Sequence, residues 1–231
     1  MRRDGPAGAG WGAGRGMRGT DPEERFLADL LRERSRVALD GSTAAARRLR
    51  QIDRRIRERF ERTVAVFVLD MAGFTRLTLL RGIVHYLMLI RRMQDACVPV
   101  LRRHRGRLVK AEADNLFAWF PAVAPAVEAS LEMFDRLSEI NAPTDDESDV
   151  QVSIGIGWGP TLVMAHDMWG GEFNFASKLG EDLAGAGEIL LTGAAHRELR
   201  GSPYRFRRRP VNVSGMPYDA WQLRLTGRGG R

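Results

Sequence analysis

The sequence predicts an α+β fold in which helices cover one mixed β-sheet, preceded by a helical extension. Apolar, β-branched stretches typical of strands alternate along the chain with stretches of amphipathic helical spacing. Two short strands at 107–110 and 115–120 are joined by a tight connection, as in a hairpin. The 231 residues, 44% of them hydrophobic, suffice for one ordinary domain plus an extension.

The first 62 residues predict an extension in two parts. Residues 1–20 hold seven glycines and almost no large apolar side chains, so they are expected to form a disordered tail. Residues 21–62 predict two basic helices, the first of which begins at Asp21 with Pro22 in its first turn. The second carries an apolar stripe made of Leu49, Ile52, Ile56 and Phe60. That stripe packs either against the main domain or in a helical dimer contact.

The positive charge of the chain belongs to this extension. Its 62 residues hold 16 arginines and 10 acidic residues, a net +6 of the formal +7. A basic surface can meet nucleic acid or an acidic membrane, but acids between the arginines are typical of a solvated helix, and no nucleic-acid partner is predicted. No apolar run reaches the roughly 20 residues of a transmembrane segment, and no secretory signal is present. The sequence therefore predicts a cytoplasmic protein whose single cysteine, Cys97, is a buried thiol.

The main domain is predicted at 63–225, followed by a disordered tail at 226–231. Its first strand, 64–69, is expected to be buried on both faces, because apolar residues follow one another without polar alternation. The elements expected after it are a long helix at about 74–103, the two strands of the hairpin, a helix at about 122–140, a strand at 150–156, a helix around 171–184, a short strand EILLT, a small helix and a last strand pair near 205–225.

Two aspartates stand where strands end. Asp70, in FVLDMAGFTRLT, either caps a helix beginning near Phe74 or holds a metal ion. Asp114, in GRLVKAEADNLFAWF, is either a structural residue of an ordinary Asp-Asn turn or a second metal ligand. If their strands are neighbours, the two carboxylates can hold Mg²⁺ ions about 4 Å apart, as in phosphoryl transfer. The turn after Asp70 would present backbone N–H groups to a phosphate chain.

Four segments carry a resemblance to a known family. DMAGFT, KAEADNLFAWF, VSIGIGWG and DMWGGEFNFASKLGEDLAGAGEILLT resemble, in order and spacing, the signature segments of the class III nucleotidyl cyclases over about residues 63–225. The resemblance implies a ferredoxin-like class III cyclase fold and a lyase that converts ATP into 3′,5′-cyclic AMP and pyrophosphate. It also implies two Mg²⁺ or Mn²⁺ ions per site and a head-to-tail homodimer whose subunits share two equivalent sites.

The resemblance assigns roles to single residues. Asp70 and Asp114 match the metal ligands, with the carbonyl of Met71 as a further ligand. The phosphate-binding turn contains Gly73, Phe74 and Thr75.

Three residues match the positions that hold the nucleoside. Lys110 and Asp167 match an adenine-selective pair, and Asn174 matches the asparagine that positions the ribose. An ammonium donates to a ring nitrogen, while a carboxylate accepts from the amino group of adenine and repels the carbonyl of guanine. If the resemblance to the family is set aside, each residue has a simpler interpretation. Lys110 is then expected to be a solvated strand residue, Asn174 a turn or cap residue, and Asp167 an acid without a partner.

The departures from the family pattern concern the phosphates. Lys178 stands where the family has an arginine, which keeps the charge but loses the two-pronged contact. The second phosphate lysine of the family corresponds at best to Ser214, and Arg207 to Arg209 are candidates to replace it. Ala113 replaces a glycine before the second aspartate.

Two further functions stay open at the level of sequence. One is a non-catalytic regulatory or dimerisation module, which Lys178 and Ser214 favour and the intact aspartate pair opposes. The other is a pyrimidine cyclase that makes cyclic UMP or CMP in defence against phage, because a carboxylate also accepts from the amino group of cytosine.

Overall fold

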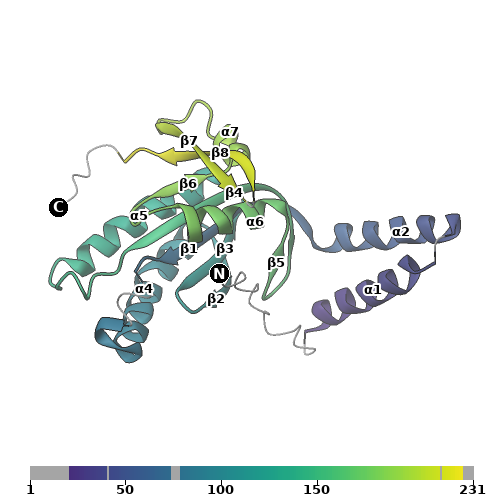
Figure 1. Cartoon of the computed structure of the whole chain (residues 1–231), viewed down its shortest axis with the longest axis horizontal. Coiled ribbons are helices and arrows are strands. Elements are labelled where there is room, and N and C mark those ends of the chain that lie inside the picture. The colour runs from purple at the N-terminus through teal and green to yellow at the C-terminus, as the bar shows by residue number, and fades with distance from the viewer. Residues whose placement is uncertain (1–20, 41, 74–78, 214, 226–231) are drawn as a thin grey trace, which may run out of the picture. The chain divides into compact units, whose positions relative to one another are not determined.

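A computed structural model describes residues 21–40, 42–73, 79–213 and 215–225. The chain divides into two compact units, Met1–Arg59 and Phe60–Arg231 (Figure 1). The two tails expected at 1–20 and 226–231 lie outside the described residues.

The first unit contains two helices, α1 (Pro22–Ala38) and α2 (Thr43–Phe60). Asp21 caps α1, since its side chain accepts a hydrogen bond from the backbone N–H of Glu23. Ion pairs join the two helices: Arg34 with Asp53 (2.6 Å), Arg48 with Glu33 (2.8 Å) and Arg59 with Glu23 (2.6 Å). The acids between the arginines thus neutralise part of the basic charge within the unit itself.

The second unit is a mixed sheet with helices. Its strands are β1 (Glu61–Met71), β2 (Arg107–Glu112), β3 (Asn115–Phe120), β4 (Val152–Val163), β5 (Met168–Trp169), β6 (Ile189–Leu191), β7 (Phe206–Val213) and β8 (Met216–Leu223). Its helices are α4 (Ile83–Arg103), α5 (Val123–Asn141), α6 (Gly171–Ser177), the π-helix η1 (Lys178–Leu183) and α7 (Gly193–Glu198). The sheet order is β2-β3-β1-β4-β6-β8-β7, with β5 on β4, and only β4 and β6 run parallel. The predicted α+β class with one mixed sheet is confirmed.

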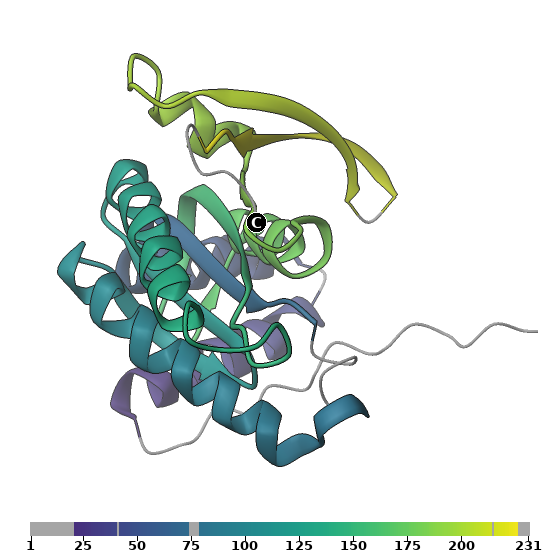
Figure 2. The same cartoon turned by 90° about the vertical axis from the view of Figure 1, so that its left-hand side faces the viewer.

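Strand β1 lies at the centre of the sheet and is buried on both faces, as its unbroken apolar run predicts. Phe67 and Leu69 belong to the core beneath α4 and α5, which lie side by side (Figure 2). Val66 and Val68 face the other way and pack with Phe173 of α6. The two helical layers therefore cover opposite faces, and Asp70, in phase with Val66 and Val68, lies on the α6 side.

Two predicted helices differ from the observed ones. The helix expected at 74–103 is interrupted at Gly82, whose φ of 83° is left-handed, so α4 begins only at Ile83. Its expected start at 74–78 lies outside the described residues. The helix expected at 171–184 changes at Lys178 from α to π geometry. Strand β4 also extends well beyond the expected 150–156.

Candidate functional site

The two candidate metal ligands are brought to the same end of the sheet. Strands β1 and β3 are antiparallel neighbours in which Leu69 pairs with Leu116, so Asp70 at the end of β1 lies near the β2–β3 connection that holds Asp114. Burial, followed by the negative charge of Asp114, raises the pKa of Asp70 to about 7. Glu181 and Asp182 of η1 add to this effect. The four carboxylates therefore share one strongly negative environment.

Each of the two aspartates accepts a hydrogen bond from a neighbouring side chain. The amide of Asn115, with its nitrogen turned toward β1, donates to Asp70 Oδ1 (2.9 Å). The hydroxyl of Tyr86 on α4 donates to Asp114 Oδ2 (2.8 Å). Sequence reasoning missed both donors. Asn115 could have been predicted as a donor, because it directly follows the proposed ligand Asp114 in the sequence. Nothing in the sequence predicts the contact of Tyr86, because it is 28 residues away from its partner.

The donor set fits a divalent cation that also binds a nucleotide. Among the described residues, no group of three or more His, Cys, Asp or Glu side chains is arranged to hold a metal ion. Mg²⁺ ordinarily takes one or two carboxylates and completes its shell with water and substrate phosphates. The mutual repulsion of Asp70 and Asp114 is what such a cation would relieve.

The turn after Asp70 is described only in part. Met71 is the buried last residue of β1, and Gly73 follows at a φ of 90°. The predicted phosphate-binding residues Phe74 and Thr75 lie outside the described residues.

The two residues expected to read the base are in contact. Lys110 Nζ lies 3.1 Å from Asp167 Oδ1, 3.5 Å from Glu112 Oε2 and 5.0 Å from the centre of the Phe117 ring. Asp167 Oδ1 also accepts from the backbone N–H of Met168 (2.9 Å). Asp167 is therefore not an acid without a partner, and Glu112 is a second carboxylate beside the lysine that the sequence reasoning did not single out.

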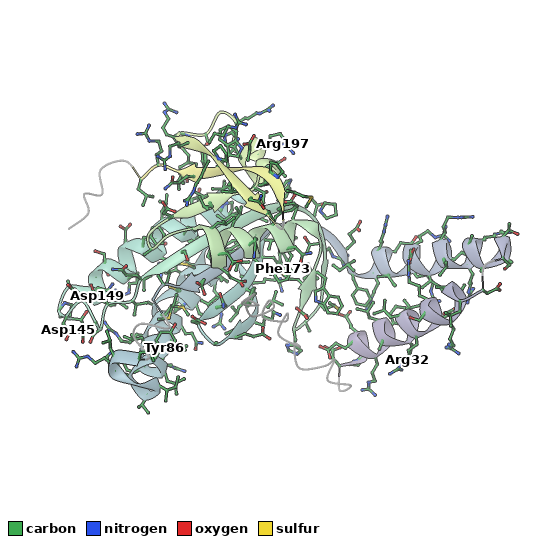
Figure 3. The ribbon with its side chains drawn as sticks, viewed as in Figure 1. Arg32, Tyr86, Asp145, Asp149, Phe173 and Arg197 are labelled. Carbon is green, nitrogen blue, oxygen red and sulfur yellow. The ribbon has the colours of Figure 1, made fainter. Side chains whose placement is uncertain are left out.

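Helix α6 and η1 carry the remaining candidates. Asn174 is exposed on α6, and its neighbour Phe173 packs against Phe117 of β3 (Figure 3). Lys178 begins η1 and forms an ion pair with Asp182 one turn on. The structure thus places the lysine of the altered phosphate position against an acid of its own chain.

The arginines of β7 have partners within the C-terminal part of the sheet. Arg207 donates to Gln222 (2.7 Å), Arg208 pairs with Asp219 (2.7 Å), and Arg209 pairs with Glu188 (2.6 Å). The first two contacts join β7 to its neighbour β8, and the third reaches the residue before β6. They give no support to the hypothesis that this run replaces a phosphate-binding lysine. Ser214 lies outside the described residues.

The glycines of VSIGIGWG allow α6 and η1 to lie directly on β4. A β-carbon at Gly155 would be 2.0 Å from the carbonyl oxygen of Ala176 and 2.6 Å from the backbone nitrogen of Gly180. Glu172 fixes the same layer, since its Oε2 accepts from the backbone N–H of Trp158 (3.0 Å) and from Thr192 Oγ1 (2.7 Å). The motif therefore positions the elements that carry Asn174 and Lys178.

Ala113 holds a backbone conformation that favours glycine, with a φ of 49°. We expect Ala113→Gly to relieve this strain and to raise the free energy of unfolding by up to about 1 kcal/mol, measured by urea denaturation. Ala111→Gly, two residues earlier in β2, is the matched control and should lower it, because a glycine within a strand costs backbone entropy. Equal losses in both variants would show that the turn before Asp114 is not strained.

Comparison with known proteins identifies the family. Residues 57–224 match the family model described as the adenylate and guanylate cyclase catalytic domain. The chain is 26% identical over 176 residues to an adenylate cyclase of Streptomyces griseus, covering 76% of this chain and 40% of that protein. It therefore spans less than half the length of this curated relative.

Solved structures show the same fold. An adenylate/guanylate cyclase/hydrolase from Silicibacter pomeroyi superimposes with a TM-score of 0.62 at 23% identity, covering 71% of this chain and 96% of that one. The adenylyl cyclase CyaB from P. aeruginosa gives 0.62 at 20% identity, covering 73% and 96%. None of the helices in the described parts of the chain has the length and apolar character needed to cross a bilayer. By the family model, which covers most of its length, the chain belongs to the adenylate and guanylate cyclase catalytic domain family.

Proposed function

We propose that the protein is a nucleotidyl cyclase that converts ATP into 3′,5′-cyclic AMP and pyrophosphate. The observation that carries this proposal is the coupled pair of Asp70 and Asp114, each held by a side-chain donor at one end of the sheet. These carboxylates, with the carbonyl of Met71, would hold two Mg²⁺ or Mn²⁺ ions. Bound there, the ions would activate the 3′-hydroxyl and neutralise charge on the phosphates.

Adenine is the proposed base because of the contact between Lys110 and Asp167. The ammonium would donate to a ring nitrogen, and the carboxylate would accept from the exocyclic amino group. A guanine carbonyl at that place would meet the carboxylate and be repelled. The contact between them, 3.1 Å from Lys110 Nζ to Asp167 Oδ1, would hold the two side chains together before the base arrives.

The active unit is proposed to be a homodimer whose subunits share the sites. A strip of large apolar side chains, between 41% and 81% exposed, spans the helical residues 79–81 and the start of α4, on the two sides of Gly82. The strip consists of Leu79, Leu80, Ile83, Val84, Leu87 and Met88. Since contiguous apolar surface of this kind is typical of interfaces, it supports burial against a second copy. Four of these residues, Ile83, Val84, Leu87 and Met88, lie on α4, the helix whose buried Tyr86 contacts Asp114.

One observation favours a second candidate function, a regulatory module without catalysis. Lys178 is the residue proposed to face the phosphates, and it is paired with Asp182 of its own chain. A nucleotide would have to compete with that carboxylate for the ammonium.

The test of the proposed function is incubation of the purified protein with each of the four nucleoside triphosphates and Mg²⁺ or Mn²⁺, followed by mass analysis of cyclic products. Cyclic AMP from ATP is the expected product. Cyclic CMP or UMP would replace the adenine assignment by a pyrimidine cyclase. If no triphosphate gives a cyclic product with either ion, the regulatory module becomes the better description.

A shared site makes a separate prediction. Asp70→Ala and Asn174→Ala should each be inactive alone, while their mixture regains about a quarter of the wild-type activity. Half of the dimers would then be mixed, and each mixed dimer has one intact site out of two.

The matched control for this mixture is Asp70→Ala combined with Asp114→Ala. Both changes damage the same half of the site, so their mixed dimers should stay inactive. Equal rescue in both mixtures, or none in the first despite proven mixed dimers, would contradict the sharing of sites.

A further inference from the structure

Tyr86 joins a core helix to one of the two candidate metal ligands. Its side chain, which Figure 3 labels, is fully buried, and its hydroxyl donates to Asp114 Oδ2 at 2.8 Å. We propose that Tyr86 is a positioning residue that fixes the Asp114 carboxylate so that its other oxygen is presented to the divalent cation. This inference rests on the proposed function.

The side chains around the Tyr86 ring are apolar, so they do not explain why a tyrosine rather than a phenylalanine is present. Tyr86 belongs to the apolar core cluster that also contains Leu89 and Met93 on the same helix. A phenylalanine would satisfy such a position, whereas a hydroxyl buried there is costly unless it is hydrogen-bonded. Asp114 supplies an acceptor, and a hydrogen bond to an ionised carboxylate is stronger than one between neutral groups. The contact thus explains why a polar atom lies at this depth.

Asp114 needs such a contact more than a residue within a strand would. It lies in the short connection between β2 and β3, directly after the left-handed Ala113. Strand pairing therefore does not fix the backbone of Asp114, whereas that of Asp70 is paired with Ser153 of β4. The phenol links the carboxylate to a helix of 21 residues that is packed on the sheet. Side-chain donors that orient metal ligands commonly change metal affinity 10- to 100-fold when they are removed.

The two side-chain donors act in the same way. The Tyr86 hydroxyl donates to one oxygen of Asp114, Oδ2, and the Asn115 amide donates to one oxygen of Asp70, Oδ1. Each carboxylate is in this way held through one oxygen, and no side chain of the described residues donates to the other one.

Tyr86→Phe in the full chain tests the proposal, with Mn²⁺ binding measured at about pH 8 from the electron paramagnetic resonance signal of the free ion. The dissociation constant of Mn²⁺ should rise about 10-fold. Tyr204→Phe is the matched control, because it removes a second phenol that packs against the same core. It should leave Mn²⁺ binding unchanged.

A double variant separates positioning from packing. In the background of Asp114→Asn, adding Tyr86→Phe should weaken Mn²⁺ binding no further, since the carboxylate that Tyr86 orients is gone. Unchanged Mn²⁺ affinity in a folded Tyr86→Phe protein would overturn the proposal, as would an equal loss in the Asp114→Asn background. If Tyr86→Phe does not fold, Tyr86→Leu is measured in its place, with the same criterion. If the wild type itself binds no Mn²⁺, the proposed metal site fails and the Tyr86 proposal with it.

Discussion

Replacing Asp70 or Asp114 by alanine is expected to lower the rate of cyclic AMP formation by at least about 10²- to 10³-fold. Each change would remove a carboxylate that holds the ions neutralising the phosphates, and the loss of one preorganised charge has an effect of this size. The measurement is the initial rate at saturating ATP and Mn²⁺. Both variants should still unfold cooperatively, because neither change removes core volume, and Asp114→Ala should be the less stable of the two, since it takes away the acceptor of the buried Tyr86 hydroxyl.

The stability of the metal-free protein distinguishes a metal ligand from a structural cap. The pKa of Asp70 is raised from 3.8 to about 7, so the folded state holds this proton more tightly than the unfolded state. The stability that this proton contributes is fully present below about pH 4 and is lost as the pH rises through 7. Asp70→Asn, which mimics the protonated form, should therefore unfold at a higher temperature than the wild type at about pH 8. A lower unfolding temperature would identify Asp70 as a stabilising cap.

Gly155→Ala is expected to lower the free energy of unfolding by about 3 kcal/mol or more, measured by urea denaturation. The new β-carbon would lie 2.0 Å from the carbonyl oxygen of Ala176, and that backbone can move only if α6 and η1 move away from β4. Because these elements carry Asn174 and Lys178, cyclase activity should fall along with stability.

Gly171→Ala is the control for this change. A β-carbon at the start of α6 would meet nothing within 4 Å, so stability should change by less than about 0.5 kcal/mol. A small loss at Gly155 would mean that the layer on β4 has room to shift, and that the glycines of VSIGIGWG are not needed for its close approach.

The features predicted correctly from the sequence are those that a short stretch of chain determines. The unbroken apolar run of 64–69 is enough to predict a strand buried on both faces, and the turn before Asn115 is short enough to be predicted from neighbouring residues. The order of the four motifs identified the family. The resemblance to the family also matched Lys110 and Asp167 to its base-reading pair, and the two are in contact.

The features that were missed depend on contacts across the fold. No local pattern shows that Tyr86 reaches Asp114, because the pairing is created by the docking of α4 on the sheet. The ion pair between Lys178 and Asp182 forms within the π-helix η1. The sequence keeps a helical spacing through this segment, so it does not indicate the change from α- to π-helix at Lys178. The interruption at Gly82 had a signal, since glycine lowers helix propensity, but the apolar residues on both sides outweighed it.

The pairing of β1 has a consequence for motion. All eleven of its residues, Glu61–Met71, are in register with β4, and Ala65 through Leu69 are paired with β3 on the other edge as well. Amide hydrogens in such a doubly paired central strand exchange with solvent only when the whole domain unfolds. The main chain up to Leu69 is therefore a fixed support for the site, and Asp70, which is paired with Ser153 of β4 alone, stands at its end. A movement of α4, α6 or η1 would take place against this fixed strand.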